Sequence, residues 1–93
     1  MTVGLLTLEL YVAGARSRKD KRAVLRRVKD RLGRFNLAVA EIAYHDLWQR
    51  AGLGIVTVGV DQEIVERTLD SALREVERVE PGVVVRSDIE WLA

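Results

Sequence analysis

The sequence predicts a single α+β domain in which four antiparallel strands and two helices follow one another in the order βαββαβ. Segments with large apolar residues at every second position are interspersed with two segments whose apolar residues recur every three to four positions. Turn-forming and helix-capping residues separate these segments. The 93 residues are enough for one modest hydrophobic core. Residues 1–93 are therefore expected to form one domain.

The first strand is predicted over Val3–Ala13, where every second residue from Leu6 to Val12 is large and apolar. Residues 14–16 turn the chain. Ser17 then begins a helix, because Asp20 follows it at the spacing of a capping box. The buried stripe of this helix is expected to contain Val24, Leu25, Val28, Leu32 and Phe35.

The remaining predicted elements are a strand over Asn36–Tyr44, a polar connection over His45–Ala51, a strand over Gly52–Val60, a helix from Asp61 to about Glu80 and a strand over Val83–Trp91. Asp61 caps the second helix, and Pro81 with Gly82 ends it. The buried face of this helix is expected to contain Ile64, Val65, Leu69, Ala72, Leu73, Val76 and Val79.

Right-handed crossovers in this order place both helices on the same face of the sheet, which is the ferredoxin-like sandwich. The opposite face is then predicted to be open and unusually apolar. It is expected to carry Leu5, Tyr11, Leu37, Val39, Leu53 and Ile55, with Glu9, Glu41 and Thr57 among them. Because a monomer rarely leaves such a patch in water, a homodimer formed through this face is predicted.

The composition limits the classes of function. The chain has no cysteine, which excludes disulfides and thiolate metal sites. Its apolar N-terminal run lacks a preceding basic region, is interrupted by Glu9 and is too short to span a bilayer. A cytoplasmic protein without membrane association, cofactor or bound metal is expected.

Charge is distributed very unevenly along the chain. Ten of the fifteen basic residues lie between Arg16 and Arg34, so that this segment has a net charge of +8 while the rest of the chain has −7. The second predicted helix carries −4, and it should lie beside the first helix. It can neutralise only one flank, because the other flank faces away; two exposed stripes are expected along the helix, one with Arg22, Arg26 and Lys29 and the other with Arg27, Arg31 and Arg34. A solvated, internally balanced helix is the structural alternative to a binding surface.

The start of the first helix is the strongest candidate for an anion-binding site. Cations there oppose the positive end of the helix dipole, which indicates selection for something other than stability. Together with free N–H groups they could bind phosphate, and an exposed stripe continues along the helix. The candidate nucleic-acid or anion-binding residues are Arg16, Arg18, Lys19, Lys21, Arg22, Arg26 and Lys29.

Residues suited to catalysis are few. His45 is the only histidine, and no nucleophile or acid is spaced to work with it. Glu9 and Glu41 could share one sheet face and bind a metal, or instead pair with Arg50 or Arg86 or contact a dimer partner. Acylphosphatases share the predicted topology, but their catalytic asparagine belongs on a central strand, whereas Asn36 is expected at a strand entrance. No catalytic residue is assigned.

Three segments resemble the YlxP-like family of small bacterial proteins of uncharacterised function. They are Ser17–Arg22 (SRKDKR), Arg34–Ile42 (RFNLAVAEI) and Asp46–Gly54 (DLWQRAGLG). The sequence departs from the family pattern at Arg18, where leucine is usual, and at Ala38, where serine is usual. The resemblance implies a ferredoxin-like fold and no established activity. It also implies genes that lie among translation and ribosome-maturation factors.

The loop segment of this resemblance contains a second candidate site. An exposed loop has little packing reason to keep a fixed polar and aromatic set, so a partner-docking or dimer contact is predicted at Asp46, Trp48, Gln49 and Arg50, with simple loop capping as the alternative. Together these features predict a non-enzymatic protein that contacts RNA or the ribosome through its first helix. The alternatives are a protein-interaction or regulatory module and, third, a small phosphoryl-substrate enzyme.

Overall fold

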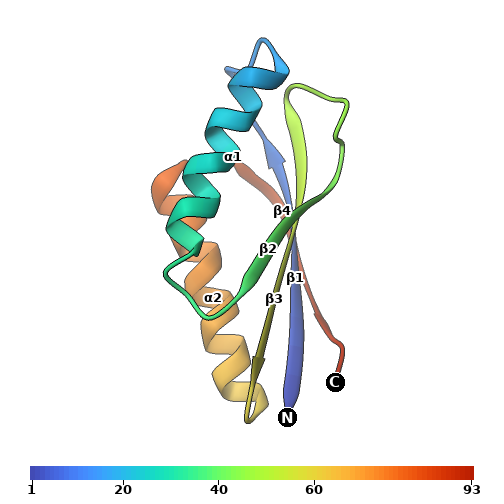
Figure 1. Ribbon diagram of the computed structural model, residues 1–93, viewed down its shortest axis with the longest axis vertical. Coiled ribbons are helices and arrows are strands. Elements are labelled where there is room, and N and C mark those ends of the chain that lie inside the picture. The colour runs from blue at the N-terminus through green and yellow to red at the C-terminus, as the bar shows by residue number, and fades with distance from the viewer.

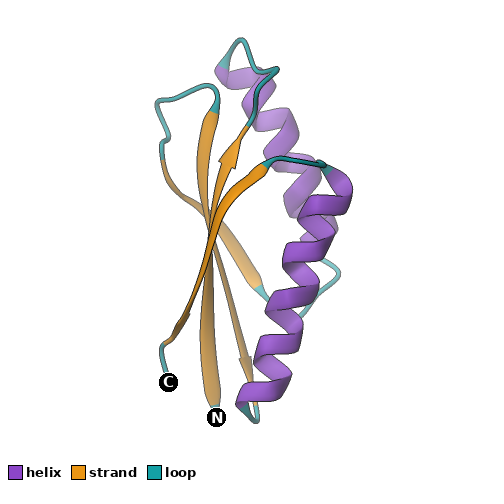
Figure 2. Cartoon of the chain, turned by 180° about the vertical axis from the view of Figure 1, so that it is seen from behind, coloured by secondary structure: helices purple, strands orange, loops and turns teal.

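Two helices cover one face of a four-stranded antiparallel sheet in the computed structural model, which describes residues 1–93 (Figure 1). The elements are β1 (Thr2–Tyr11), α1 (Arg18–Leu32), β2 (Ala38–Ala43), β3 (Arg50–Gly59), α2 (Gln62–Val79) and β4 (Val84–Trp91). The sheet order is β2-β3-β1-β4. Both helices lie on the same side of the sheet (Figure 2), so the ferredoxin-like prediction is confirmed.

Both predicted helix caps are present. The Ser17 hydroxyl accepts a hydrogen bond from the Asp20 N–H at 3.1 Å, and the Asp20 carboxylate accepts one from the Arg16 N–H at 2.9 Å. This reciprocal capping box fixes the start of α1. The Asp61 carboxylate accepts a bond from the Ile64 N–H at 3.0 Å and starts α2 in the same way.

The hydrophobic core lies between the sheet and the two helices. Its fully buried members on α1 and α2 include most of the residues predicted from helical spacing. Ile64 is an exception, because it lies in the first turn of α2 and remains exposed. The largest fully buried side chains are Leu6, Leu8, Leu10, Leu32, Leu53, Ile55, Leu69, Val28, Val65 and Val76.

The pairing of β1 with β3 corrects the predicted composition of the open sheet face. Leu53 pairs with Leu8 and Ile55 pairs with Leu6, so both side chains point toward the helices. The β2 residues opposite them lie on the same side. The prediction was therefore wrong for Leu37, Val39, Leu53, Ile55, Glu41 and Thr57.

The open face nevertheless retains an apolar part. Leu5 and Tyr11 lie on it as predicted, and the pairing adds Val56 and Val58 of β3. Gly54 has no side chain between Leu5 and Ile42, and a Cβ there would lie 3.3 Å from two carbons of Ile42. Val56 and Val58 make the β3 part of this face apolar beside Leu5, whereas β4 contributes the carboxylates of Asp88 and Glu90. No helix of the protein is long and apolar enough to cross a membrane.

Candidate nucleic-acid interface

One flank of α1 is neutralised by α2, as the sequence predicts. Arg27 donates to the Glu80 carboxylate at 2.6 Å, and an Arg31 nitrogen lies 3.9 Å from a Glu75 oxygen. The two helices lie side by side in both overall views (Figures 1 and 2). Positive charge on this flank is therefore balanced within the molecule.

The opposite flank of α1 keeps its positive charge unbalanced. Four basic side chains of α1 lie on this flank: Lys19, Arg22, Arg26 and Lys29. At about 100° of rotation per residue, they fall within an arc of about 80° around the helix axis. None of them has a carboxylate within ion-pairing distance, and neither does Arg16 just before the helix. We call this set the basic flank; it consists of Arg16, Lys19, Arg22, Arg26 and Lys29.

Lys21 does not belong to this surface, which corrects one predicted binding residue. Its side chain is buried, and the residue is only 2% exposed. Its ammonium lies 3.1 Å from a carboxylate oxygen of Glu41 and donates to the backbone carbonyls of Tyr44 at 2.9 Å and Arg50 at 3.2 Å. Lys21 thus joins α1 to the ends of β2 and β3.

A sequence signal for this burial existed. Lys21 precedes Leu25 by four residues and Val28 by seven, which is the spacing of the buried stripe. Glu41 likewise lies two residues after Val39 on β2, so the two side chains share the side of the strand that packs against the core. A lysine and a glutamate at core positions of neighbouring elements indicate a buried ion pair.

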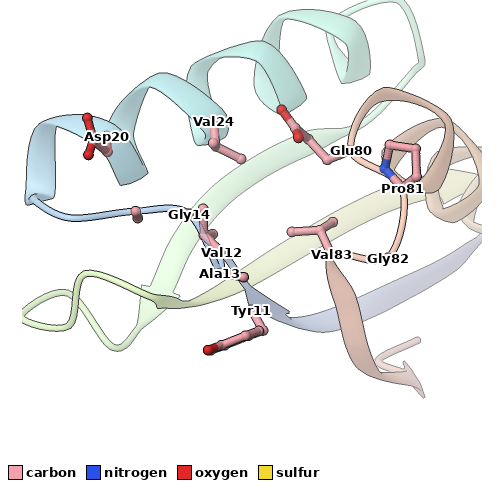
Figure 3. Close-up of a pocket in the computed structure, with 11 residues that line it drawn as sticks. Tyr11, Val12, Ala13, Gly14, Asp20, Val24, Glu80, Pro81, Gly82 and Val83 are labelled. Carbon is pink, nitrogen blue, oxygen red and sulfur yellow. The ribbon is translucent and has the colours of Figure 1, made fainter.

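The start of α1 is partly occupied by a carboxylate of the protein itself. Asp20 accepts the Arg16 N–H, and Arg18 extends toward Asp46 at 3.5 Å. A hollow of about 340 Å³ next to Asp20 is closed on its other side by Glu80 and residues 81–83 (Figure 3). Because both carboxylates border this hollow, it does not suit an anion. The cations of α1 that have no ion-pair partner lie on the basic flank instead.

Three of the four predicted docking residues in the loop have structural partners. Gln49 donates from Nε2 to the carbonyls of Ala15 at 3.1 Å and Ala13 at 3.4 Å. Arg50 forms an ion pair with Glu9 and lies 4.3 Å from the centre of the Tyr44 ring. Asp46 pairs with Arg18. Gln49 thus joins the loop between β2 and β3 to the turn before α1, Asp46 joins it to the first turn of α1, and Arg50 joins the start of β3 to β1.

Trp48 is the fourth predicted docking residue, and it is 53% exposed. It lines a surface hollow of about 440 Å³ together with Tyr11 and Leu47, and the polar residues Asp46, Gln49 and Arg50 complete the lining. The loop therefore has a rigid polar frame and an exposed apolar centre.

The geometry gives little support for catalysis by the residues considered above. Glu9 pairs with Gly52 on the open face, whereas Glu41 lies on the helix-facing side, so the predicted possibility of a shared metal site is wrong. Glu9 bonds instead to Arg50, one of the two alternatives. His45 is exposed, with Nε2 3.1 Å from the Glu41 carbonyl oxygen. No group of three or more histidine, aspartate or glutamate side chains is placed to hold a metal.

The fold and this surface define a small ferredoxin-like domain with one basic helical flank. Residues 3–89 match DUF503, a family described as a protein of unknown function, and the chain belongs to this family. It is 38% identical over 72 residues to the uncharacterised protein YlxP of Bacillus subtilis (strain 168). That match covers 76% of this chain and 78% of YlxP.

Solved structures with the same architecture are distant in sequence. SnoaB, a cofactor-independent oxygenase from Streptomyces nogalater, superposes with a TM-score of 0.62 at 13% identity, covering 100% of this chain and 93% of SnoaB. A putative antibiotic biosynthesis monooxygenase from Bordetella bronchiseptica gives 0.53 at 13% identity, covering 100% and 97%. The de novo designed protein Foldit4 gives 0.56 at 14% identity, covering 99% and 96%. These similarities show a shared fold alone.

Proposed function

We propose that this protein is a non-enzymatic RNA- or ribosome-associated protein that contacts the phosphate backbone through the basic flank. The observation that supports this proposal is the absence of any ion pair from the five cations of that flank, while the opposite flank of α1 is paired with α2. Internal charge balance does not explain the flank. A cytoplasmic location is part of the proposal.

The length of the flank favours a polymer over a small anion. Lys19 and Lys29 are ten residues apart, which at 1.5 Å per residue separates them by about 15 Å along the helix. A single phosphate contacts one end of such a row, whereas a nucleic-acid backbone contacts several cations at once. Contacts of this kind are sensitive to salt and carry little sequence information.

The open sheet face is a poor surface for phosphate. Asp88 and Glu90 of β4 pair with Thr7 and Leu5 of β1, which places both carboxylates on that face. Arg50 is already paired there with Glu9. We therefore assign the phosphate contacts to the helical side of the molecule.

A charge-neutralising pair of substitutions tests the proposal. We expect Arg22→Gln/Arg26→Gln to weaken filter binding of ribosomal RNA fragments between 50 and 300 mM salt. Loss of two phosphate contacts should make the negative slope of log K against log salt shallower by roughly 1.5. The matched control is Arg67→Gln/Arg74→Gln, which removes the same charge from exposed positions on α2.

The control separates a defined surface from an effect of net charge. Equal losses in the two double variants would contradict a site on α1. Unchanged RNA binding in the flank variant would instead favour the alternative function, a module whose basic helix meets an acidic protein.

We also propose that two copies associate through the apolar part of the open face, which contains Leu5, Ile42, Val56 and Val58. Val58 is 49% exposed there. Val58→Lys should convert a dimer to a monomer in sedimentation equilibrium, because a charge cannot be buried unpaired in such an interface. Val60→Lys, just beyond the end of β3, is the control that should leave the mass unchanged. A monomeric wild-type protein would contradict this proposal.

A further inference from the structure

An exposed aromatic surface lies at the end of the molecule where α1 begins. Tyr11, Leu47 and Trp48 are all exposed, although large apolar side chains usually lie inside a protein. They line the hollow of about 440 Å³ described above. We call these three residues the aromatic corner. None of the three packs in the hydrophobic core. Exposed apolar side chains that lie together with polar residues around them are typical of an interaction site.

The aromatic corner has a fixed position relative to the basic flank. Gln49 bonds to the carbonyls of Ala13 and Ala15, and Arg18 in the first turn of α1 pairs with Asp46. The β2–β3 loop and the start of α1 lie at the same end of the molecule in Figure 1. The pair between Arg18 and Asp46 thus connects the first turn of α1, from which the basic flank extends, to the loop that carries Leu47 and Trp48.

We infer that the aromatic corner binds an unpaired nucleobase of a single-stranded RNA whose phosphates lie on the basic flank. This inference rests on the function proposed above. Single-stranded RNA presents both a phosphate backbone and free base faces, and proteins recognise those faces by stacking them on aromatic rings. Duplex RNA keeps its bases stacked inside and offers the flank only its backbone.

The polar lining of the hollow also favours a base over a phosphate. The two charged side chains of the lining, Asp46 and Arg50, are paired with Arg18 and Glu9, so the hollow offers phosphate no unpaired cation, whereas the Asp46 carboxylate can accept hydrogen bonds from the amino group or ring N–H of a base. The phosphates of the same strand meet the cations of α1 instead. The two surfaces thus match the two chemical parts of a nucleotide chain.

Tryptophan fluorescence tests the inference directly. Trp91→Phe leaves Trp48 as the only tryptophan. A twelve-nucleotide single-stranded RNA should quench its emission, whereas heparin, a polyanion without bases, and the corresponding RNA duplex should not. We expect Trp48→Ala to weaken binding of the single strand by roughly 5- to 100-fold and to change duplex binding less than about twofold. Trp48→Phe, which keeps a ring, should restore most of the affinity.

The possible results separate this inference from the proposed function. If Trp48→Ala binds the single strand as tightly as the wild type while Arg22→Gln/Arg26→Gln is defective, the nucleobase site is refuted and the backbone contact stands. Equal quenching by heparin also refutes it. A change from dimer to monomer in Trp48→Ala would assign the corner to self-association instead. Absence of binding to any RNA would overturn both proposals.

Discussion

Replacing Lys21 by methionine should lower the free energy of unfolding by about 3 kcal/mol. The substitution keeps the apolar length of the side chain but removes an ammonium that bonds to Glu41, to the Tyr44 carbonyl and to the Arg50 carbonyl. A buried carboxylate and a backbone carbonyl then lose their partner. The unpaired groups, rather than a lost attraction, cause the destabilisation.

The magnitude follows from how far each group is withdrawn from water. Removing one partner of a buried ion pair costs about 3–5 kcal/mol. The Glu41 side chain is 19% exposed and can be hydrated in part, which favours the lower end of that range. The Tyr44 carbonyl keeps the Leu47 N–H as a donor at 3.1 Å, so its loss is small. For a domain of this size, 3 kcal/mol corresponds to a fall in Tm of roughly 12–24 °C.

Thermal and denaturant unfolding of three variants would check this reasoning. Lys19→Met, at an exposed position of the same helix, should change stability by less than about 0.5 kcal/mol. Lys21→Met/Glu41→Leu should recover at least half of the loss, because both charges are gone. A double variant no more stable than Lys21→Met, or a single variant as stable as the wild type, would refute the buried-pair account.

Three further predictions concern stability. Ser17→Ala should cost about 1 kcal/mol in urea unfolding, because the Asp20 N–H loses its acceptor; an unchanged midpoint would contradict a working cap. Gly4→Ala should cost about 1–3 kcal/mol, since the new Cβ would lie 2.7 Å from Val65 Cγ1; a stabilised variant would show that the helix has room to move. A hydrogen bond and the charge of Arg78, with smaller contributions from Arg31 and Arg34, outweigh desolvation and lower the pKa of Glu75 below 4.5. The ion pair therefore stabilises the fold above pH 4.5, and this stabilisation is lost as the pH falls through the lowered pKa. The Tm difference between wild type and Arg78→Gln should therefore shrink as the pH falls through the lowered pKa of Glu75, and a difference that stays constant over the whole acidic range in which the fold persists would contradict the pairing.

The fold was predictable because its local signals agree with one another. Ser17 with Asp20, Asp61, and Pro81 with Gly82 mark the helix boundaries, and each lies where the structure places it. The leucines of β1 alternate with polar residues, so the core-facing side of that strand was clear. The ends of the strands differ by up to two residues, and α1 ends at Leu32, so that Phe35 lies beyond the helix in whose buried stripe it was predicted.

The faces of β2 and β3 were not predictable for a physical reason. From Gly52 to Val60 apolar or small residues occupy both alternating sets, so no period of two distinguishes the core side from the open side. The register of β3 against β1 decides which side chains of β3 face the core. That register depends on contacts between segments far apart in the sequence. The burial of Lys21 was missed because its charge suggested a surface position, although its spacing indicated the core.

The fastening of the β2–β3 loop to α1 has a kinetic consequence. Lys21, Gln49 and Arg18 join the loop and helix in the free protein, so a ligand meets a surface that needs little ordering. For the RNA complex proposed above, we therefore expect rigid-body docking at a rate set by long-range attraction to the basic flank. Salt should therefore slow association. The short-range contact with Trp48 should instead govern the residence time. The basic flank would then determine the association rate and the aromatic corner the dissociation rate.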